Sequence, residues 1–358
     1  METLVNKFKG KRVLVTGHTG FKGGWFSLWM SHWGANVLGY SIDVPTKPSF
    51  FDATQLATRI DDRRGDIRSL EDMQKVFSEF KPELVFHFAA QPMVLESYHN
   101  PLSTFSTNVM GTANVLECVR NSPDVKLTMV VTSDKCYENH EKSEGYREGD
   151  PLGGHDPYSA SKAATEIVAQ AWFNSFFKHL NTRMGYCTVR AGNVFGGGDW
   201  GQYRLIPDFV RAVTNNHVLK MRHPKNVRPW QHVLNCLWGY ILLASHLMDE
   251  PEKFSGHWNF GPRTSDHLTA GEVIQSLQET WGKGQWEVEP QQNNQLKETT
   301  LLALNWDKAA QNLGWQPVWD LQQGIEKTVE WYNTFLEDPK NIMTISQHHL
   351  DTFLKAVQ

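Results

Sequence analysis

The sequence predicts a doubly wound α/β protein, in which helices cover both faces of a parallel sheet and a smaller, mostly helical lobe lies toward the C-terminal end. Two observations lead to this prediction. Short apolar runs alternate with helical patterns as far as residue 190, and the runs are unbroken, as in parallel strands that are buried on both faces. Beyond residue 200 the alternation weakens, and the remaining pattern is mainly helical.

The composition is that of a soluble globular protein. A length of 358 residues is enough for one large domain or two closely joined ones. A formal net charge of −4 gives no reason to expect nucleic acid or a membrane surface as partner. No apolar run approaches the roughly 18 residues of a membrane helix, and the first residues lack the apolar core of a signal peptide.

The cysteines and histidines argue for a cytoplasmic protein without a metal. The cysteines are few and widely spaced, which suits reduced thiols. The histidines show no metal-binding spacing such as H-E-x-x-H. We therefore expect a cytoplasmic location and neither a structural nor a catalytic metal.

The stretch from Arg12 to Asp43 has the order of a dinucleotide-binding unit. An apolar run at residues 13–15 predicts a strand, and the glycine-rich residues 16–23 follow it. Apolar residues then recur at helical spacing, before a second apolar run at residues 37–40. This order predicts a strand, a glycine turn, a helix and a second strand.

Each glycine of the turn has a physical task. Gly17 can take the tight bend out of the strand, Gly20 lets a pyrophosphate approach the helix N-terminus, and Gly23 lets the helix pack close to the sheet. Asp43 follows about 20 residues later, where a carboxylate accepts hydrogen bonds from both ribose hydroxyls. Because a carboxylate would also repel a 2′-phosphate, NAD is favoured over NADP. A tight turn without a ligand is the alternative, and it leaves Asp43 unexplained.

Two later strand ends offer further cofactor contacts. Asp66 and Ile67 follow a predicted strand end, a position beside the adenine in a dinucleotide fold, although a plain turn is the alternative for each. An amphipathic helix over residues 70–80 leads to the apolar run 84–88, which predicts a buried strand. A cofactor could approach the residues at its end, which are Ala89, Ala90 and Gln91.

A polar segment ends the next strand. A long helix is expected over residues 101–119, and the apolar run 126–131 predicts the strand that follows it. Residues 132–135, with the sequence Thr-Ser-Asp-Lys, come directly after this strand. Since ligands bind at the carboxyl ends of strands in open α/β sheets, these side chains are candidates for the chemistry.

Tyr158 and Lys162 open a helix that is expected to run from Pro157 to about Leu180. Four residues apart, they share one face of that helix. A nearby ammonium favours the phenolate and should lower the tyrosine pKa from its reference near 10 toward neutrality. Such a tyrosine can take the proton of a substrate alcohol while hydride leaves for NAD, and Ser133 can share a hydrogen bond with that alcohol. The alternative is a surface contact between two helix neighbours.

The second half of the chain completes the sheet and forms the smaller lobe. Further strands are expected at residues 187–189 and 258–261, and helices at 206–215 and 233–248, with loops around residues 285–300. We therefore divide the chain into a sheet domain, residues 1–190 and 230–262, and a smaller lobe, residues 191–229 and 263–358.

Together these motifs resemble those of the extended short-chain dehydrogenases/reductases that act on nucleotide sugars, over essentially the whole chain. The motifs that carry the resemblance are the Gly17/Gly20/Gly23 loop, Asp66-Ile67, Ala89-Ala90, Asn108 and Tyr158/Lys162. Asp134 followed by Lys135, with residues 18–23 and 228–232, is similar to the CDP-glucose 4,6-dehydratases of this family. The dehydratases for dTDP-glucose and GDP-mannose carry Asp followed by Glu instead.

The resemblance implies a Rossmann sheet that binds NAD and a lobe that binds the nucleotide sugar. The residues implied to contact the cofactor are Gly17, Thr19, Gly20, Phe21, Lys22, Gly23, Asp43, Asp66, Ile67, Ala89, Ala90, Gln91, Asn108, Tyr158 and Lys162. Asn193 and Arg228 are expected to bind the substrate pyrophosphate, since a guanidinium suits phosphate oxygens. Arg190 and Arg204 are expected there as well, with structural salt bridges as the alternative.

The resemblance also implies a reaction. Tyr158 deprotonates the C4 hydroxyl of CDP-glucose while hydride passes to NAD. Lys135 then removes the C5 proton, and protonated Asp134 donates to the leaving C6 hydroxyl. Alternatively, Lys135 stays charged and stabilises the developing enolate, while water or Asp134 moves the C5 proton. The hydride returns to C6, which gives CDP-4-keto-6-deoxyglucose, a precursor of deoxysugars in bacterial surface polysaccharide such as the lipopolysaccharide O-antigen.

Two other kinds of function remain open. One is a 4-epimerase, or a dehydratase for another nucleotide, on the same fold. The other is an inert NAD-binding sensor, against which the intact Tyr158/Lys162 pair argues. As extended family members do, two subunits should pair the helices at 101–119 and 157–180 into a four-helix contact, so we expect at least a homodimer.

Overall fold

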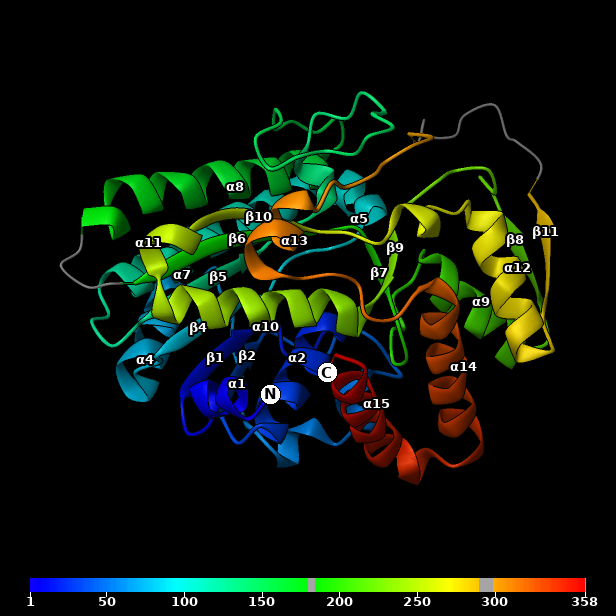
Figure 1. The fold of residues 1–358 in the computed structure, drawn as a ribbon, viewed down its shortest axis with the longest axis horizontal. Helices are drawn as coiled ribbons and strands as arrows, with labels where there is room; N and C mark the ends of the chain where they lie inside the picture. The colour runs from blue at the N-terminus through cyan, green and yellow to red at the C-terminus, as the bar shows by residue number, and fades with distance from the viewer. Residues whose placement is uncertain (180–183, 290–298, 358) are drawn as a thin grey trace.

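A seven-stranded parallel sheet organises the fold (Figure 1). In this computed structural model, which describes residues 1–179, 184–289 and 299–357, the strand order is β10-β6-β5-β4-β1-β2-β3. The order reverses at β1, as in a doubly wound sheet. The strands are β1 Arg12–Thr16, β2 Asn36–Ser41, β3 Asp61–Arg64, β4 Leu84–His87, β5 Leu127–Val131, β6 Gly185–Ala191 and β10 Gly256–Phe260.

Helices pack on both faces of this sheet, which confirms the predicted fold class. Val13 and Val15 of β1 point into one core with α2 (Phe21–His32) and α10 (Val233–Asp249), which lies along the sheet in Figure 1. Leu14 points into a second core with three helices of the opposite face, α4 (Leu70–Phe80), α7 (Gly111–Arg120) and α8 (Pro157–Ser175). Because both faces are covered, the strand has no polar side, and its apolar run is unbroken.

Two predicted helices differ in detail from the observed ones. The helix expected over residues 101–119 consists of α6 (Pro101–Phe105), a π-helical turn η2 (Ser106–Met110) and α7. The predicted end of the next helix, near Leu180, was wrong, because α8 ends at Ser175 and a short 3-10 turn η4 (Phe177–His179) follows. Leu180 itself lies outside the described residues.

The smaller lobe lies at one end of the sheet (Figure 1). It contains α9 (Leu205–Thr214), α12 (Ala270–Trp281) and the two-stranded sheet of β8 (Val218–Met221) and β11 (Gln285–Val288). The prediction of a loop over residues 285–300 was therefore wrong for residues 285–288, which form β11. Residues 290–298 lie outside the described ranges. The strands β7 (Asn193–Phe195) and β9 (Trp230–His232) pair in parallel between the sheet and this lobe.

The last helix returns to the sheet. Phe353 of α15 (Ile342–Val357) packs edge-on against Trp29 of α2, with ring centroids 5.8 Å apart, so this part of residues 263–358 touches the sheet domain. The predicted division into domains remains a prediction. The other elements are α1 Glu2–Phe8, α3 Phe50–Ala53, η1 Leu56–Thr58, α5 Val94–His99, η3 Asp134–Cys136, α11 Pro251–Phe254, η5 Thr264–Asp266, α13 Asp307–Leu313, α14 Leu321–Glu337 and η6 Pro339–Asn341.

Within the described residues, no helix has the length and apolar character needed to cross a membrane.

Candidate active site

A cavity of about 1640 Å³ opens at the carboxyl ends of the strands. Its walls come from the glycine turn, the ends of β2 to β5, the start of α8 and, across from them, α9, β8 and residues 226–230 of the smaller lobe. Ligand pockets commonly measure about 300–1,000 Å³, so a cavity of this volume has room for more than one ligand-sized molecule.

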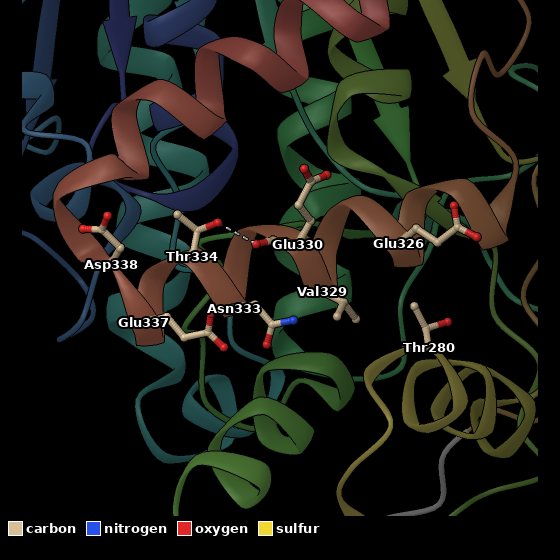
Figure 2. Close-up of a pocket in the computed structure, with 8 residues that line it drawn as sticks. All are labelled: Thr280, Glu326, Val329, Glu330, Asn333, Thr334, Glu337 and Asp338. Carbon is tan, nitrogen blue, oxygen red and sulfur yellow. Dashed lines mark hydrogen bonds between the residues drawn. The ribbon is translucent and has the colours of Figure 1, made fainter.

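A smaller hollow of about 490 Å³ lies between α12 and α14 (Figure 2). Figure 2 shows the carboxylates of Glu326, Glu330 and Glu337 spaced along α14, with Thr280 of α12 opposite. None of the residues predicted for the site lines this hollow. The chemistry therefore belongs to the larger cavity.

The glycine turn forms a cradle that side chains would fill. Gly17 has a φ of +77°, and a Cβ there would meet the Ala89 nitrogen at 2.6 Å. A Cβ on Gly23 would meet the Gly17 carbonyl oxygen at 2.2 Å. Gly20 is the N-cap of α2 and faces the cavity, so the free N–H groups and positive dipole end of this helix point into it. The residues present therefore fit a dinucleotide pyrophosphate.

Two carboxylates line the cavity on the side of β2 and β3. Asp43 lies on the wall just after β2, and the Thr19 hydroxyl donates to its carbonyl oxygen at 2.6 Å. Asp66 lies after β3, where a hydrogen bond from Arg68 holds its pKa below the usual range. Because β2 and β3 are neighbours in parallel register, both carboxylates reach the same part of the cavity as the glycine turn. This arrangement suits an adenosine.

The acid–base residues gather after β5. The Ser133 hydroxyl donates to Asp134 Oδ1 at 2.9 Å and accepts from the Lys135 backbone N–H at 3.3 Å. Asp134 is 1% exposed, and its Oδ2 has no hydrogen-bond partner within the described residues. A buried carboxylate oxygen is costly to leave unpaired, so a ligand group is its natural partner. Lys135 lines the same cavity.

Tyr158 and Lys162 face these residues from α8. Burial raises the pKa of Tyr158 to about 12, while Ser133 and Arg204 act in the opposite direction. Burial also lowers the pKa of Lys162 to about 8, and Lys22 adds to that shift. The sequence prediction that Lys162 brings the Tyr158 pKa toward neutrality was therefore wrong for the protein alone, because the cost of desolvating the phenolate is larger.

Most of the predicted site residues come together in this one cavity. Every residue predicted for cofactor contact lines it except Asn108. The side chain of Asn108 is buried and holds the backbone of Gln91, accepting from its N–H at 2.8 Å and donating to its carbonyl at 3.1 Å. Asn108 thus holds the backbone of a cavity-lining residue in place without lining the cavity itself.

The predicted substrate residues divide in a similar way. Asn193, Arg204 and Arg228 line the cavity. Arg204 forms an ion pair with Asp199 at 3.0 Å and keeps 34% of its side chain exposed. Arg190 is 1% exposed and does not line the cavity. Its guanidinium forms a salt bridge with Glu166 at 2.8 Å, which is the structural alternative considered above for this residue.

Sequence reasoning missed two buried residues. His18, between the first two glycines, has Nδ1 2.9 Å from the Ser41 hydroxyl and Nε2 2.8 Å from Asp62, which fixes the glycine turn to β2 and β3. No spacing in the sequence signals these contacts. Glu166 stands one helical turn beyond Lys162 and accepts several hydrogen bonds. Its spacing from Tyr158 and Lys162 was a readable signal.

Within the described ranges, no three His, Cys, Asp or Glu residues lie together so that they could hold a metal ion.

The chain is similar to known proteins over most of its length. The sequence model of the GDP-mannose 4,6 dehydratase family matches residues 14–328. The chain is 45% identical over 355 residues to a CDP-glucose 4,6-dehydratase of Salmonella typhimurium, which covers 98% of both chains. It is 26% identical to a dTDP-glucose 4,6-dehydratase of Xanthomonas campestris pv. campestris, over 90% of this chain and 93% of that one.

Solved structures show the same fold. A UDP-glucose 4-epimerase of Thermotoga maritima with UDP-glucose superposes with a TM-score of 0.76 at 22% identity, over 91% of this chain and 99% of that one. A dTDP-glucose 4,6-dehydratase of Bacillus anthracis in complex with NAD superposes with a TM-score of 0.74 at 24% identity, over 90% of this chain and 96% of that one. Epimerases and dehydratases share this fold, so the fold alone does not distinguish the two activities. The distinction has to come from the side chains of the site.

Proposed function

The chain belongs to the GDP-mannose 4,6-dehydratase family, and from this premise we propose that it is an NAD-dependent hydro-lyase that converts CDP-glucose to CDP-4-keto-6-deoxyglucose. The observation that carries the proposal is the meeting of Asp134 and Lys135 with Tyr158 in one cavity, beside a cradle that fits a dinucleotide. The choice of CDP-glucose is supported by the relative that is 45% identical over 98% of this chain.

The first step is oxidation at C4. NAD held on the glycine cradle supplies the hydride acceptor for C4 and later the hydride donor for C6. Tyr158 takes the proton of the C4 hydroxyl, and Ser133, which forms a hydrogen bond with Tyr158, can share a hydrogen bond with the same hydroxyl. Below its pKa of about 8, Lys162 retains an ammonium whose charge favours the phenolate.

The second step is elimination of water across C5 and C6. The 4-ketone acidifies the proton on C5, and Lys135 accepts it. Asp134, protonated for this step, gives its proton to the C6 hydroxyl, which leaves as water. Asp134 is buried, and its Oδ2 has no partner among the described residues, which suits a carboxyl group that donates to a ligand.

The substrate's diphosphate and base extend into the smaller lobe. Arg228 donates to the carbonyl oxygens of Val227 at 2.9 Å and Thr299 at 2.7 Å, which hold its guanidinium on the cavity wall. With Asn193 and Arg204 it gives this half of the cavity donors suited to phosphate oxygens.

Incubation with CDP-, dTDP-, UDP- and GDP-glucose, followed by mass spectrometry, tests the proposal. We expect the loss of one water from CDP-glucose and no change in the others. An isomer of unchanged mass would identify a 4-epimerase, and water loss from another nucleotide only would identify a different dehydratase. No turnover of any of them would favour the inert NAD-binding sensor.

Lys135→Met is expected to separate the two steps. Methionine keeps an unbranched side chain, one atom shorter than that of lysine, but it cannot accept a proton or carry charge, so C4 oxidation should persist and elimination should stall. Single-turnover measurements of nicotinamide reduction and of product release check this. Lys142→Met, which removes an ion pair with Asp150 outside the cavity, is the control and should turn over normally. Product release by Lys135→Met at the wild-type rate would contradict both roles considered for Lys135.

We further propose a homodimer. Leu102, Phe105 and Met110 are 85%, 37% and 56% exposed on the run from α6 to η2, and Ile167 is 58% exposed on α8, which packs beside α6. Apolar side chains that cluster on adjacent helices mark an interaction surface. A second copy of the same pair of helices would cover them by two-fold symmetry.

Sedimentation should therefore give twice the chain mass of 41.0 kDa at micromolar concentration. The double variant Leu102→Glu/Ile167→Glu should sediment as a folded monomer, since charges replace the apolar contact. Val288→Glu, at an equally exposed position on β11, is the control and should remain a dimer. A monomeric wild-type protein would disprove this arrangement.

A cytoplasmic location and a role in supplying deoxysugars for surface polysaccharide, such as the lipopolysaccharide O-antigen, complete the proposal. All four cysteines are free and buried, as in proteins of a reducing compartment.

A further inference from the structure

A fully buried ion pair lies directly behind the proposed catalytic residues. Glu166 and Arg190 are 0% and 1% exposed, and Arg190 donates to both carboxylate oxygens, from Nε at 2.9 Å and from Nη2 at 2.8 Å. The same carboxylate accepts from the hydroxyls of Thr132 and Thr188 and lies 3.0 Å from Nδ1 of His257. Burial alone would raise the pKa of Glu166, but Arg190 brings it below the usual range, so the carboxylate stays ionised.

The ion pair holds both ends of the catalytic segment. Thr132, which donates to Glu166, immediately precedes Ser133. At the other end, the Tyr137 hydroxyl accepts from Nη1 of Arg190 at 2.7 Å and donates to Asn259 at 2.8 Å. Residues 133–136, which include Asp134 and Lys135, are therefore clamped between two contacts with one charge pair.

The clamp also joins this segment to the helix that carries the oxidising pair. Glu166 follows Tyr158 by eight residues and Lys162 by four on α8, so the three side chains project from one helix face. The base of the proposed oxidation, Tyr158, and its neighbour Lys162 lie on α8. The two proton-transfer groups of the proposed elimination, Asp134 and Lys135, lie on the segment 133–136, of which only Ser133 also takes part in oxidation. Their relative position therefore depends on Glu166.

We propose that Glu166 is a positioning residue that sets Asp134 and Lys135 against the sugar held by Tyr158, and so controls elimination more than oxidation. This inference rests on the proposed function. A displacement of about 1 Å at a reacting centre can lower a rate about 100-fold. Weakening the tether should thus slow elimination, whose proton-transfer groups both lie on the segment, far more than oxidation, whose base lies on α8.

Two isosteric substitutions test the proposal on the whole enzyme. Thr132→Val removes the hydroxyl that ties the catalytic segment to Glu166. Thr188→Val removes a second buried hydroxyl that donates to the same carboxylate, but from β6, outside the catalytic segment. We expect Thr132→Val to slow product release about 100-fold while nicotinamide reduction changes less than about twofold. For Thr188→Val we expect both rates to stay within about twofold of wild type. A second tether variant, Tyr137→Phe, should repeat the selective loss.

The possible results distinguish the role of Glu166 from the proposed function on which it rests. If wild type releases no dehydrated product from CDP-glucose, the proposed function fails. If wild type does so but Thr132→Val loses oxidation and elimination equally, or Thr188→Val loses as much as Thr132→Val, Glu166 has only a structural role. Thermal melting of each variant shows whether a loss of rate follows a loss of stability.

Discussion

Asp134→Asn is expected to trap the enzyme with reduced cofactor and no released product. Asparagine keeps the shape of the side chain and an oxygen that can accept from Ser133, as Asp134 Oδ1 does at 2.9 Å. It cannot supply the proton that the C6 hydroxyl needs in order to leave. Because a general acid typically contributes about 10²- to 10⁴-fold, turnover should fall by that factor while C4 oxidation continues. The absorbance of reduced nicotinamide should therefore rise and persist after one equivalent of CDP-glucose is added.

Asp150→Asn is the matched control for this variant. Asp150 is an ion-pair partner of Lys142 and does not line the cavity, so the substitution should leave turnover close to wild type. Asp134→Asn that releases product at the wild-type rate would remove Asp134 from the mechanism. A variant that neither reduces nicotinamide nor releases product would show that Asp134 is needed before elimination.

Tyr158→Phe should slow both steps strongly, because elimination can begin only after oxidation. The loss of its phenolate should lower nicotinamide reduction by about 10²- to 10⁴-fold. The wild-type rate of this step should rise with pH below pH 8, where Lys162 keeps its ammonium. Burial raises the pKa of Tyr158 to about 12, so the phenolate fraction grows about tenfold per pH unit below that value. The slope should vanish in Tyr158→Phe.

Tyr186→Phe is the control for the tyrosine. Its hydroxyl is buried, has no hydrogen-bond partner within the described residues and does not line the cavity, so its removal should not change the pH profile. If Tyr158→Phe reduced nicotinamide with the wild-type pH dependence, another group would be the base.

The sheet and most of the cavity wall were predictable from local patterns. The apolar run from Val13 to Val15 predicts a strand buried on both faces, and the strand packs into both cores. Gly17 and Gly23 predict places where backbone segments approach closely, and a Cβ at either position would meet backbone atoms. The carboxyl ends of parallel strands meet at one edge of the sheet. Once the strands were recognised, the polar residues after β5 could therefore be assigned to the site.

The predictions that were wrong or missing depended on tertiary surroundings that the local sequence does not show. Arg190 lies within β6, one residue before the end of the strand. Its guanidinium turns inward to Glu166, and no pattern in the sequence shows which way it points. The pKa of Tyr158 could not be read from its spacing to Lys162, because burial outweighs a nearby charge. Short strands such as β7 and β11 carry too few residues to show a period.

The path of one hydrogen atom tests the central claim most directly. If hydride leaves C4 and returns to C6 within one closed site, CDP-glucose deuterated at C4 should give product with deuterium in the new methyl group, in ordinary water and without excess NAD. Unlabelled substrate turned over in heavy water should gain deuterium at C5, because that proton passes through an ionisable group. Loss of the C4 deuterium to solvent, or a stoichiometric requirement for added NAD, would contradict the account and indicate a simple dehydrogenase.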